Sequence, residues 1–241
     1  MRFLGIGLAG LIPVALAACS IHIDAGTPVR LGGNAVTGSG KRVSEDRPVP
    51  AFHGVEFGGS GSVNVAVGGP QKVTVEIDDN LLSRVTTTVE GGVLHIGTKG
   101  SYLSDKGLRV TIQVPSLDSI DMSGSGSARI AGLHGGKLDA ALSGSGKIDA
   151  SGTVERVHLD ISGSGEADLA SLKSRDAGVT ISGSGSARVD ATDSLKADIS
   201  GSGSVNYTGN PKNVDKSISG SGRVSGGRVG RVPEDQPRRR E

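Results

Sequence analysis

Residues 142–189 read LSGSGKIDASGTVERVHLDISGSGEADLASLKSRDAGVTISGSGSARV and contain the tetrapeptide SGSG three times. Over the whole chain, the tetrapeptide begins at Ser123, Ser143, Ser162, Ser182, Ser200 and Ser219. The successive spacings are 20, 19, 20, 18 and 19 residues. Flexible glycine–serine linkers have no reason to keep a period, whereas a constant period of this length is typical of stacked structural repeats. We therefore expect SGSG to be a fixed corner of a repeating fold.

The residues on both sides of SGSG alternate between apolar and polar side chains. The residue directly before the tetrapeptide is apolar in every repeat: Met122, Leu142, Ile161, Ile181, Ile199 and Ile218. The second residue after it is also apolar: Ala128, Ile148, Ala167, Ala187 and Val205. Alternation with a period of two is the pattern of a β-strand with one buried face. Lys216 interrupts the pattern in the last repeat, as expected of a terminal coil that meets water.

A unit of about 19 residues with one apolar face cannot bury that face alone, so successive units must stack. Stacking as a coil places equivalent residues about 4.8 Å apart along the axis, which lines up the aliphatic side chains inside. The glycines permit a tight bend, and the serines can form hydrogen bonds at the corner. The sequence thus predicts an all-β fold, a parallel β-helix (β-solenoid) with about 19–20 residues per coil, over residues 37–227.

From Gly59 to Gly124 the chain lacks the regular tetrapeptide. Strand-like alternation still occurs at residues 62–67, 72–77, 84–89, 93–96 and 108–114. We interpret this part as the same solenoid with longer corners. The alternative is an antiparallel cap, because Thr88–Ile96 with Gly91-Gly92 has the pattern of a β-hairpin.

The two ends of the chain differ from the repeats. Residues 1–18 have a basic start at Arg2 and a short apolar stretch, and they end in Leu16-Ala17-Ala18 before Cys19, the only cysteine. This pattern is typical of a lipoprotein signal peptide and predicts lipid attachment at Cys19. Residues 19–36 are expected to be a tether and residues 228–241 a disordered tail. Ser20 is not aspartate, which in lipoproteins of Gram-negative bacteria favours the outer membrane.

Composition excludes several function classes. The chain has 26 basic and 25 acidic side chains, a net charge of +1, and no nucleic-acid-binding motif, so we expect no nucleic acid partner. The five histidines show no metal-ligand spacing, and no nucleophile motif is present. We predict no metal, no cofactor and no catalytic residue.

One outward row is the best alternative to that prediction. Asp149 and Asp168 occupy equivalent positions on successive coils, and Arg129 and Arg188 occupy the same position on either side. Two carboxylates about 5 Å apart could act in glycoside chemistry. Rows of arginine and aspartate are also an ordinary way to cover the outside of a solenoid.

Other parts of the chain resemble a known family. The matching pieces are Phe52, Val55, Gly59–Val63, Val75–Leu82, Gly92–Ile96 and Leu117–Gly126, followed by the SGSG repeats. Over roughly residues 38–226 the sequence resembles the putative autotransporter adhesin head, GIN-type domain family. The resemblance implies an exported, often lipid-anchored protein built as a right-handed parallel β-helix.

We therefore expect a non-catalytic, adhesin-like binding module of the cell envelope, held at the membrane through Cys19. Its partner would be an envelope polymer, a glycan or a protein. Two alternatives remain open: an envelope polysaccharide-processing enzyme that uses the exposed aspartates, and a periplasmic assembly or sensing partner.

Overall fold

The computed structural model describes residues 35–226. Within this range the only helix is the short 3-10 helix η1 (Asp79–Arg84), and strands account for most of the rest. The predictions made for the signal peptide, for Cys19, for tether residues 19–34 and for the tail at 228–241 lie outside the described residues.

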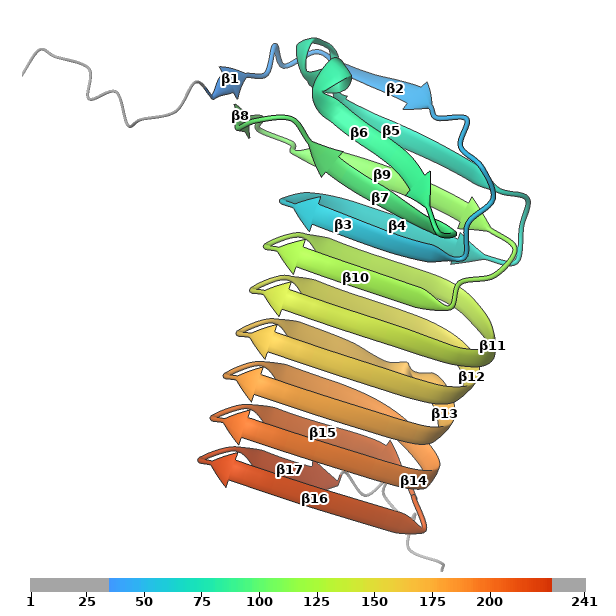
Figure 1. Cartoon of the computed structure of the whole chain (residues 1–241), viewed down its shortest axis with the longest axis vertical. Helices are drawn as coiled ribbons and strands as arrows, with labels where there is room; N and C mark the ends of the chain where they lie inside the picture. Colours follow the sequence, from blue (N-terminus) through green and yellow to red (C-terminus); the bar gives the residue numbers. More distant parts are fainter. Residues whose placement is uncertain (1–34, 227–241) are drawn as a thin grey trace, which may run out of the picture. The chain divides into compact units, whose positions relative to one another are not determined.

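The SGSG repeats form the expected β-solenoid. Strand β10 (Ser119–Gly124) precedes the first corner. The strands that follow are β11 (Ser127–Gly144), β12 (Lys147–Gly163), β13 (Glu166–Gly183), β14 (Ser186–Gly201), β15 (Ser204–Gly209), β16 (Asn213–Gly220) and β17 (Arg223–Gly226). In Figure 1 the front strands run left and the rear strands run right as the chain descends, which makes the coil right-handed.

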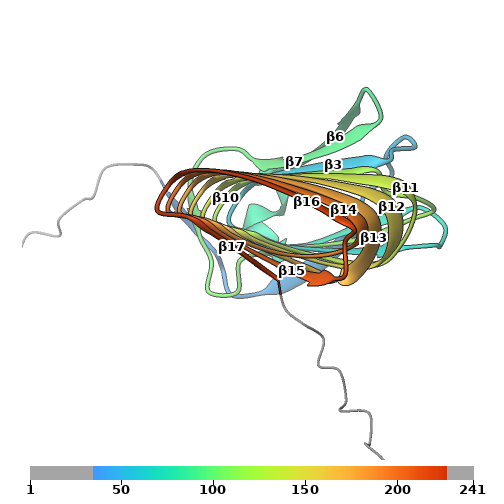
Figure 2. The same ribbon diagram turned by 90° about the horizontal axis from the view of Figure 1, so that it is seen from below.

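Each coil has two faces, seen end-on in Figure 2 as the two long sides of a flattened loop. The upstream face consists of Ser119–Gly124 and the segments that stack on it, which end at the start of a glycine–serine corner. The downstream face consists of Ser127–Ala131 and the segments that pair with it, which follow a corner. All neighbouring strands in these coils are parallel.

The register superimposes the predicted apolar positions on one another. On the upstream face, Met122 pairs with Leu142, Leu142 with Ile161, and the row continues through Ile181, Ile199 and Ile218. All of these side chains except that of Ile218 are buried. Burying one such aliphatic side chain contributes about 1.5–3 kcal/mol, so these rows supply the main stabilising term.

The corner glycines are required by the stacking itself. Gly144 has a φ of 119°, in the region that L side chains avoid, and a β-carbon there would lie 2.5 Å from the carbonyl oxygen of Gly124. That oxygen accepts a hydrogen bond from the backbone N–H of Ser145 at 3.0 Å. Only glycine lets one corner approach the previous one closely enough to form this bond.

The first part of the domain mixes regular coils with a cap. Strands β3 (Gly54–Gly59) and β4 (Gly61–Val67) stack in parallel on β10 and β11. Beyond them lie β7 (Val93–Thr98) and β9 (Leu108–Val114), also parallel, so this coil comes later in the sequence but further out in space. The expected coils are therefore present here, although not in chain order.

The expectation of uninterrupted coils is wrong for the outermost strands. Strands β2 (Arg42–Asp46), β5 (Lys72–Asp78) and β6 (Val85–Glu90) are all antiparallel to their neighbours. Strands β6 and β7 form the alternative hairpin, with Gly91 and Gly92 at φ values of 57° and 79° in its turn. A separate two-stranded pair, β1 (Val36–Thr37) with β8 (Tyr102–Leu103), completes the cap.

The opposite end of the solenoid carries no such cap within the described residues. Every residue of β16 is exposed, including Ile218 at 43%. Lys216 stands in the inward row of this last coil, with its Nζ 5.4 Å from the centre of the Tyr207 ring. A charged inward residue on an edge strand is a common protection against pairing with another chain.

Candidate functional site: the outward rows of the two faces

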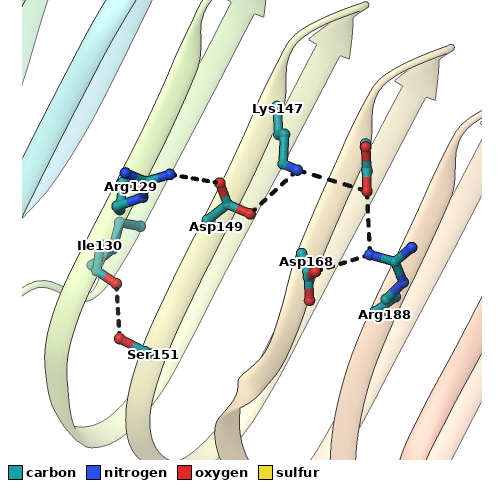
Figure 3. Close-up of polar contacts among 8 residues, drawn as sticks. Arg129, Ile130, Lys147, Asp149, Ser151, Asp168 and Arg188 are labelled. Atoms are coloured by element: carbon teal, nitrogen blue, oxygen red, sulfur yellow. Dashed lines mark hydrogen bonds and ion pairs between the residues drawn. The ribbon is translucent and has the colours of Figure 1, made fainter.

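The register brings together the four residues of the predicted outward row. Arg129, Asp149, Asp168 and Arg188 stand on β11, β12, β13 and β14, each directly paired with the next. They alternate with buried residues such as Ile130 and Ile148, so their side chains point away from the core on the downstream face. Figure 3 shows the row from outside.

These side chains form a network of ion pairs that also includes Lys147 and Glu166. On one side, the Asp149 carboxylate lies 3.8 Å from an Arg129 nitrogen and 3.6 Å from Lys147 Nζ. On the other, Arg188 Nη1 lies 2.9 Å from Asp168 and 3.4 Å from Glu166. A 3.8 Å contact between Lys147 and Glu166 joins the two halves (Figure 3).

The two additional members of this network were not picked out from the sequence. Lys147 and Glu166 both occupy the first position after an SGSG corner, and they pair directly in the register. An alignment of the repeats at the first position after SGSG would have shown that Lys147 and Glu166 lie beside Asp149 and Asp168.

Ion pairs hold the network together, because every carboxylate in it lies within 3.8 Å of a lysine or arginine nitrogen. The side chains are also well exposed, from 30% for Asp149 to 74% for Arg129. Exposed ion pairs of this kind contribute about 0–1 kcal/mol each to the stability of the fold. The row therefore adds little to stability, and its side chains can rearrange to meet a ligand.

The upstream face carries a second row of a different character. Asp121, Asp160 and the more distant Asp198 stand on alternate coils, separated by Ala141 and Thr180. The short Ala141 leaves a depression of about 310 Å³ between the first two aspartates.

Two histidines at this depression pair with acidic side chains. His95 Nδ1 lies 2.8 Å from Glu56 Oε2, and His158 Nε2 lies 3.1 Å from Asp160. Partial desolvation and the neighbouring Glu56 carboxylate raise the pKa of Asp121 above its usual value. The lining of this depression therefore contains four carboxylates and two histidines but no lysine or arginine, whereas the charges of the downstream row are balanced.

Two features are absent from residues 35–226. No three His, Cys, Asp or Glu side chains in this range lie together so as to hold a metal ion. The same range contains no helix with the length and apolar character needed to span a bilayer.

Residues 51–211 match the family described as "Putative auto-transporter adhesin, head GIN domain". No curated protein matches the chain.

Solved structures share the fold. A putative adhesin from Bacteroides fragilis is 22% identical, covers 80% of this chain and 100% of its own, and superimposes with a TM-score of 0.67. A putative adhesin from Parabacteroides distasonis is 24% identical, with coverages of 80% and 100% and a TM-score of 0.53. A putative lipid binding protein from the same species is 26% identical, with coverages of 80% and 99% and a TM-score of 0.50.

Proposed function

Since the chain belongs to the putative auto-transporter adhesin, head GIN domain family, we propose that it is a non-catalytic binding module of the bacterial cell envelope. The observation that carries this proposal is that the upstream and downstream faces of the solenoid both present ordered rows of outward side chains to solvent. Parallel rungs about 4.8 Å apart hold outward side chains at fixed positions, so a ligand meets a surface that is already ordered. The solved relatives named as putative adhesins support the same role.

We also propose that the module is anchored in the outer membrane by lipid at Cys19. The basic start, the apolar stretch and the Leu-Ala-Ala-Cys ending of residues 1–19 support this proposal. Several acyl chains on one cysteine give stable anchoring where a single chain gives marginal binding. A rigid domain on such an anchor suits contact with a polymer or protein outside the membrane.

The anchor is tested with Cys19→Ala and with Ser20→Ala as the matched control. We expect the wild-type chain and the Ser20→Ala variant to incorporate a labelled fatty acid and to sediment with membranes. The Cys19→Ala variant should lose both properties. Incorporation of label by Cys19→Ala would show that the attachment site is wrong.

Surface display is tested by protease and antibody accessibility of the domain on intact cells. We expect labelling before the outer membrane is opened. Protection until that membrane is broken would contradict surface binding and would favour a periplasmic partner instead.

A further inference from the structure

We propose that a polar depression on the downstream face binds an oxyanion group of an acidic polysaccharide. This proposal rests on the binding role proposed above and names the ligand chemistry. The depression has a volume of about 370 Å³ and lies where β9, β4 and β11 meet, beside the Arg129 end of the ion-pair network.

The register explains why a hollow forms at this place. Arg109 on β9 pairs with Ser62 on β4, and Ser62 pairs with Ser127 on β11. In the neighbouring row, Asn64 on β4 pairs with Arg129 on β11. The middle strand therefore presents only short side chains, with one long arginine on each side. A gap bordered by two guanidinium groups is left between them.

Both arginines keep hydrogen-bonding capacity for a ligand. Arg109 lies 3.6 Å from Glu76, and Arg129 lies 3.8 Å from Asp149; within residues 35–226 these are their only ion pairs, and neither guanidinium forms a hydrogen bond. By contrast, Arg42 already donates to Glu76 at 2.7 Å and to the carbonyl of Gly107.

The available donors match an oxyanion. Each guanidinium carries five N–H donors in a planar fork that fits the two oxygens of a carboxylate, sulfate or phosphate. The exposed fractions of the Arg109 and Arg129 side chains are 55% and 74%, so a ligand can reach both.

The rest of the lining favours a saccharide over an apolar ligand. Ser62, Ser127 and Asn64 supply two hydroxyls and an amide, and in the described part of the chain their side chains form no hydrogen bond. Ala128 is the only apolar residue of the lining. Hydroxyl and amide groups can exchange hydrogen bonds with sugar hydroxyls. Asp149 also lines the depression, and its carboxylate, 3.8 Å from Arg129, competes with a ligand for that guanidinium.

The test measures binding of the full-length chain, purified in detergent, to immobilised polygalacturonate and to dextran sulfate, with neutral dextran as the blank. We expect binding to at least one acidic polymer, none to dextran, and weakening as the salt concentration rises, because exposed charges are screened. Arg109→Gln and Arg129→Gln should each weaken binding about tenfold, the scale of one charged hydrogen bond.

Arg175→Gln is the matched control. It removes the same charge from an arginine of similar exposure, 67%, but the Arg175 guanidinium already lies 3.0 Å from Asp193 and outside the depression. We expect its affinity to equal that of the wild type. Asp149→Asn should bind as well as the wild type or better, because Arg129 loses its competing carboxylate.

Each outcome has a distinct meaning. Binding to polygalacturonate alone identifies a carboxylate ligand, binding to dextran sulfate alone identifies a sulfate, and either supports the site. An equal loss in Arg175→Gln would show a response to overall charge and would overturn the proposed site. Failure of the wild type to bind both polymers would also overturn it, although surface display would still stand. If the domain is protected from protease on intact cells but the purified chain still binds the polymers, surface display is refuted and the proposed binding site stands.

Discussion

Replacing Gly163 by alanine would test whether the SGSG corners are rigid parts of the solenoid. Gly163 ends β12, at the corner that stacks on Gly144 of the previous coil. Its φ is 120°, and a β-carbon there would lie 2.6 Å from the Gly144 carbonyl oxygen and 3.3 Å from the Gly144 carbonyl carbon. These neighbours are backbone atoms, so no side-chain rotation relieves the contact.

The expected cost follows from two contributions. Holding a non-glycine residue in this region of φ costs about 1–3 kcal/mol. The Gly144 oxygen that the new β-carbon would displace accepts a hydrogen bond from the N–H of Ser164 at 2.9 Å. Weakening that bond adds about 1 kcal/mol. We expect Gly163→Ala to lower the free energy of unfolding by about 2–4 kcal/mol, which is about 5–15 °C in Tm for a domain of this size.

The measurement is urea and thermal unfolding followed by far-UV circular dichroism, with Gly136→Ala as the matched control. A β-carbon at Gly136 would meet no atom within 4 Å, and its φ lies outside the left-handed region. Both variants restrict the unfolded chain equally, so their difference reports on the folded corner. If Gly163→Ala unfolds within about 0.5 kcal/mol of Gly136→Ala, the corner adapts and the reasoning is wrong.

Three further predictions concern the open end and the charged residues. Lys216→Val should shift the sedimentation distribution towards larger species than the wild type, because it removes the inward charge from the edge strand, while Lys216→Arg should not; an unchanged distribution would contradict this protective role. Asp121→Asn should raise Tm at pH 7, because partial desolvation and Glu56 raise the pKa of Asp121 and so make its charged form unfavourable in the folded protein. Near pH 3 the wild-type carboxyl gains its proton, so the Tm values of the variant and the wild type should be the same. A lower Tm of the variant at pH 7 would refute this prediction. Asp193→Asn should lower Tm at pH 7 and match the wild type at low pH, because Lys212 holds the pKa of Asp193 below its usual value and that stabilisation is lost as acid protonates the carboxyl. An unaltered pH dependence of Tm would count against a stabilising pair of Asp193 and Lys212.

The repeats could be predicted in detail because their pairing is local. Each coil contacts the coils before and after it, so equal spacing of SGSG places Ser143 beside Ser123 and Asp168 beside Asp149. Alternation then decides which residues face inward, as the buried row from Met122 to Ile199 shows. The opposition of Asp149 and Asp168 in the candidate row follows from the same period.

The first part of the domain could be predicted only in part. Residues 108–114 were expected to be a strand, and β9 spans Leu108–Val114. Its partners could not be predicted, because alternation is the same in a parallel strand and in an antiparallel one. The structure pairs β9 with β4 on one side and with the antiparallel β5 on the other.

The amino-acid sequence by itself determined the solenoid, its period, its glycine corners and the residues of its outward rows. These features follow from a short repeat, because each strand pairs with the equivalent strand of the next repeat. The tertiary structure alone decided that β9 lies outside β4 and so brings Arg109 to the depression beside Arg129. Without a repeat, strand order depends on which distant segments bury the most apolar surface together. No local pattern in residues 59–124 records that choice.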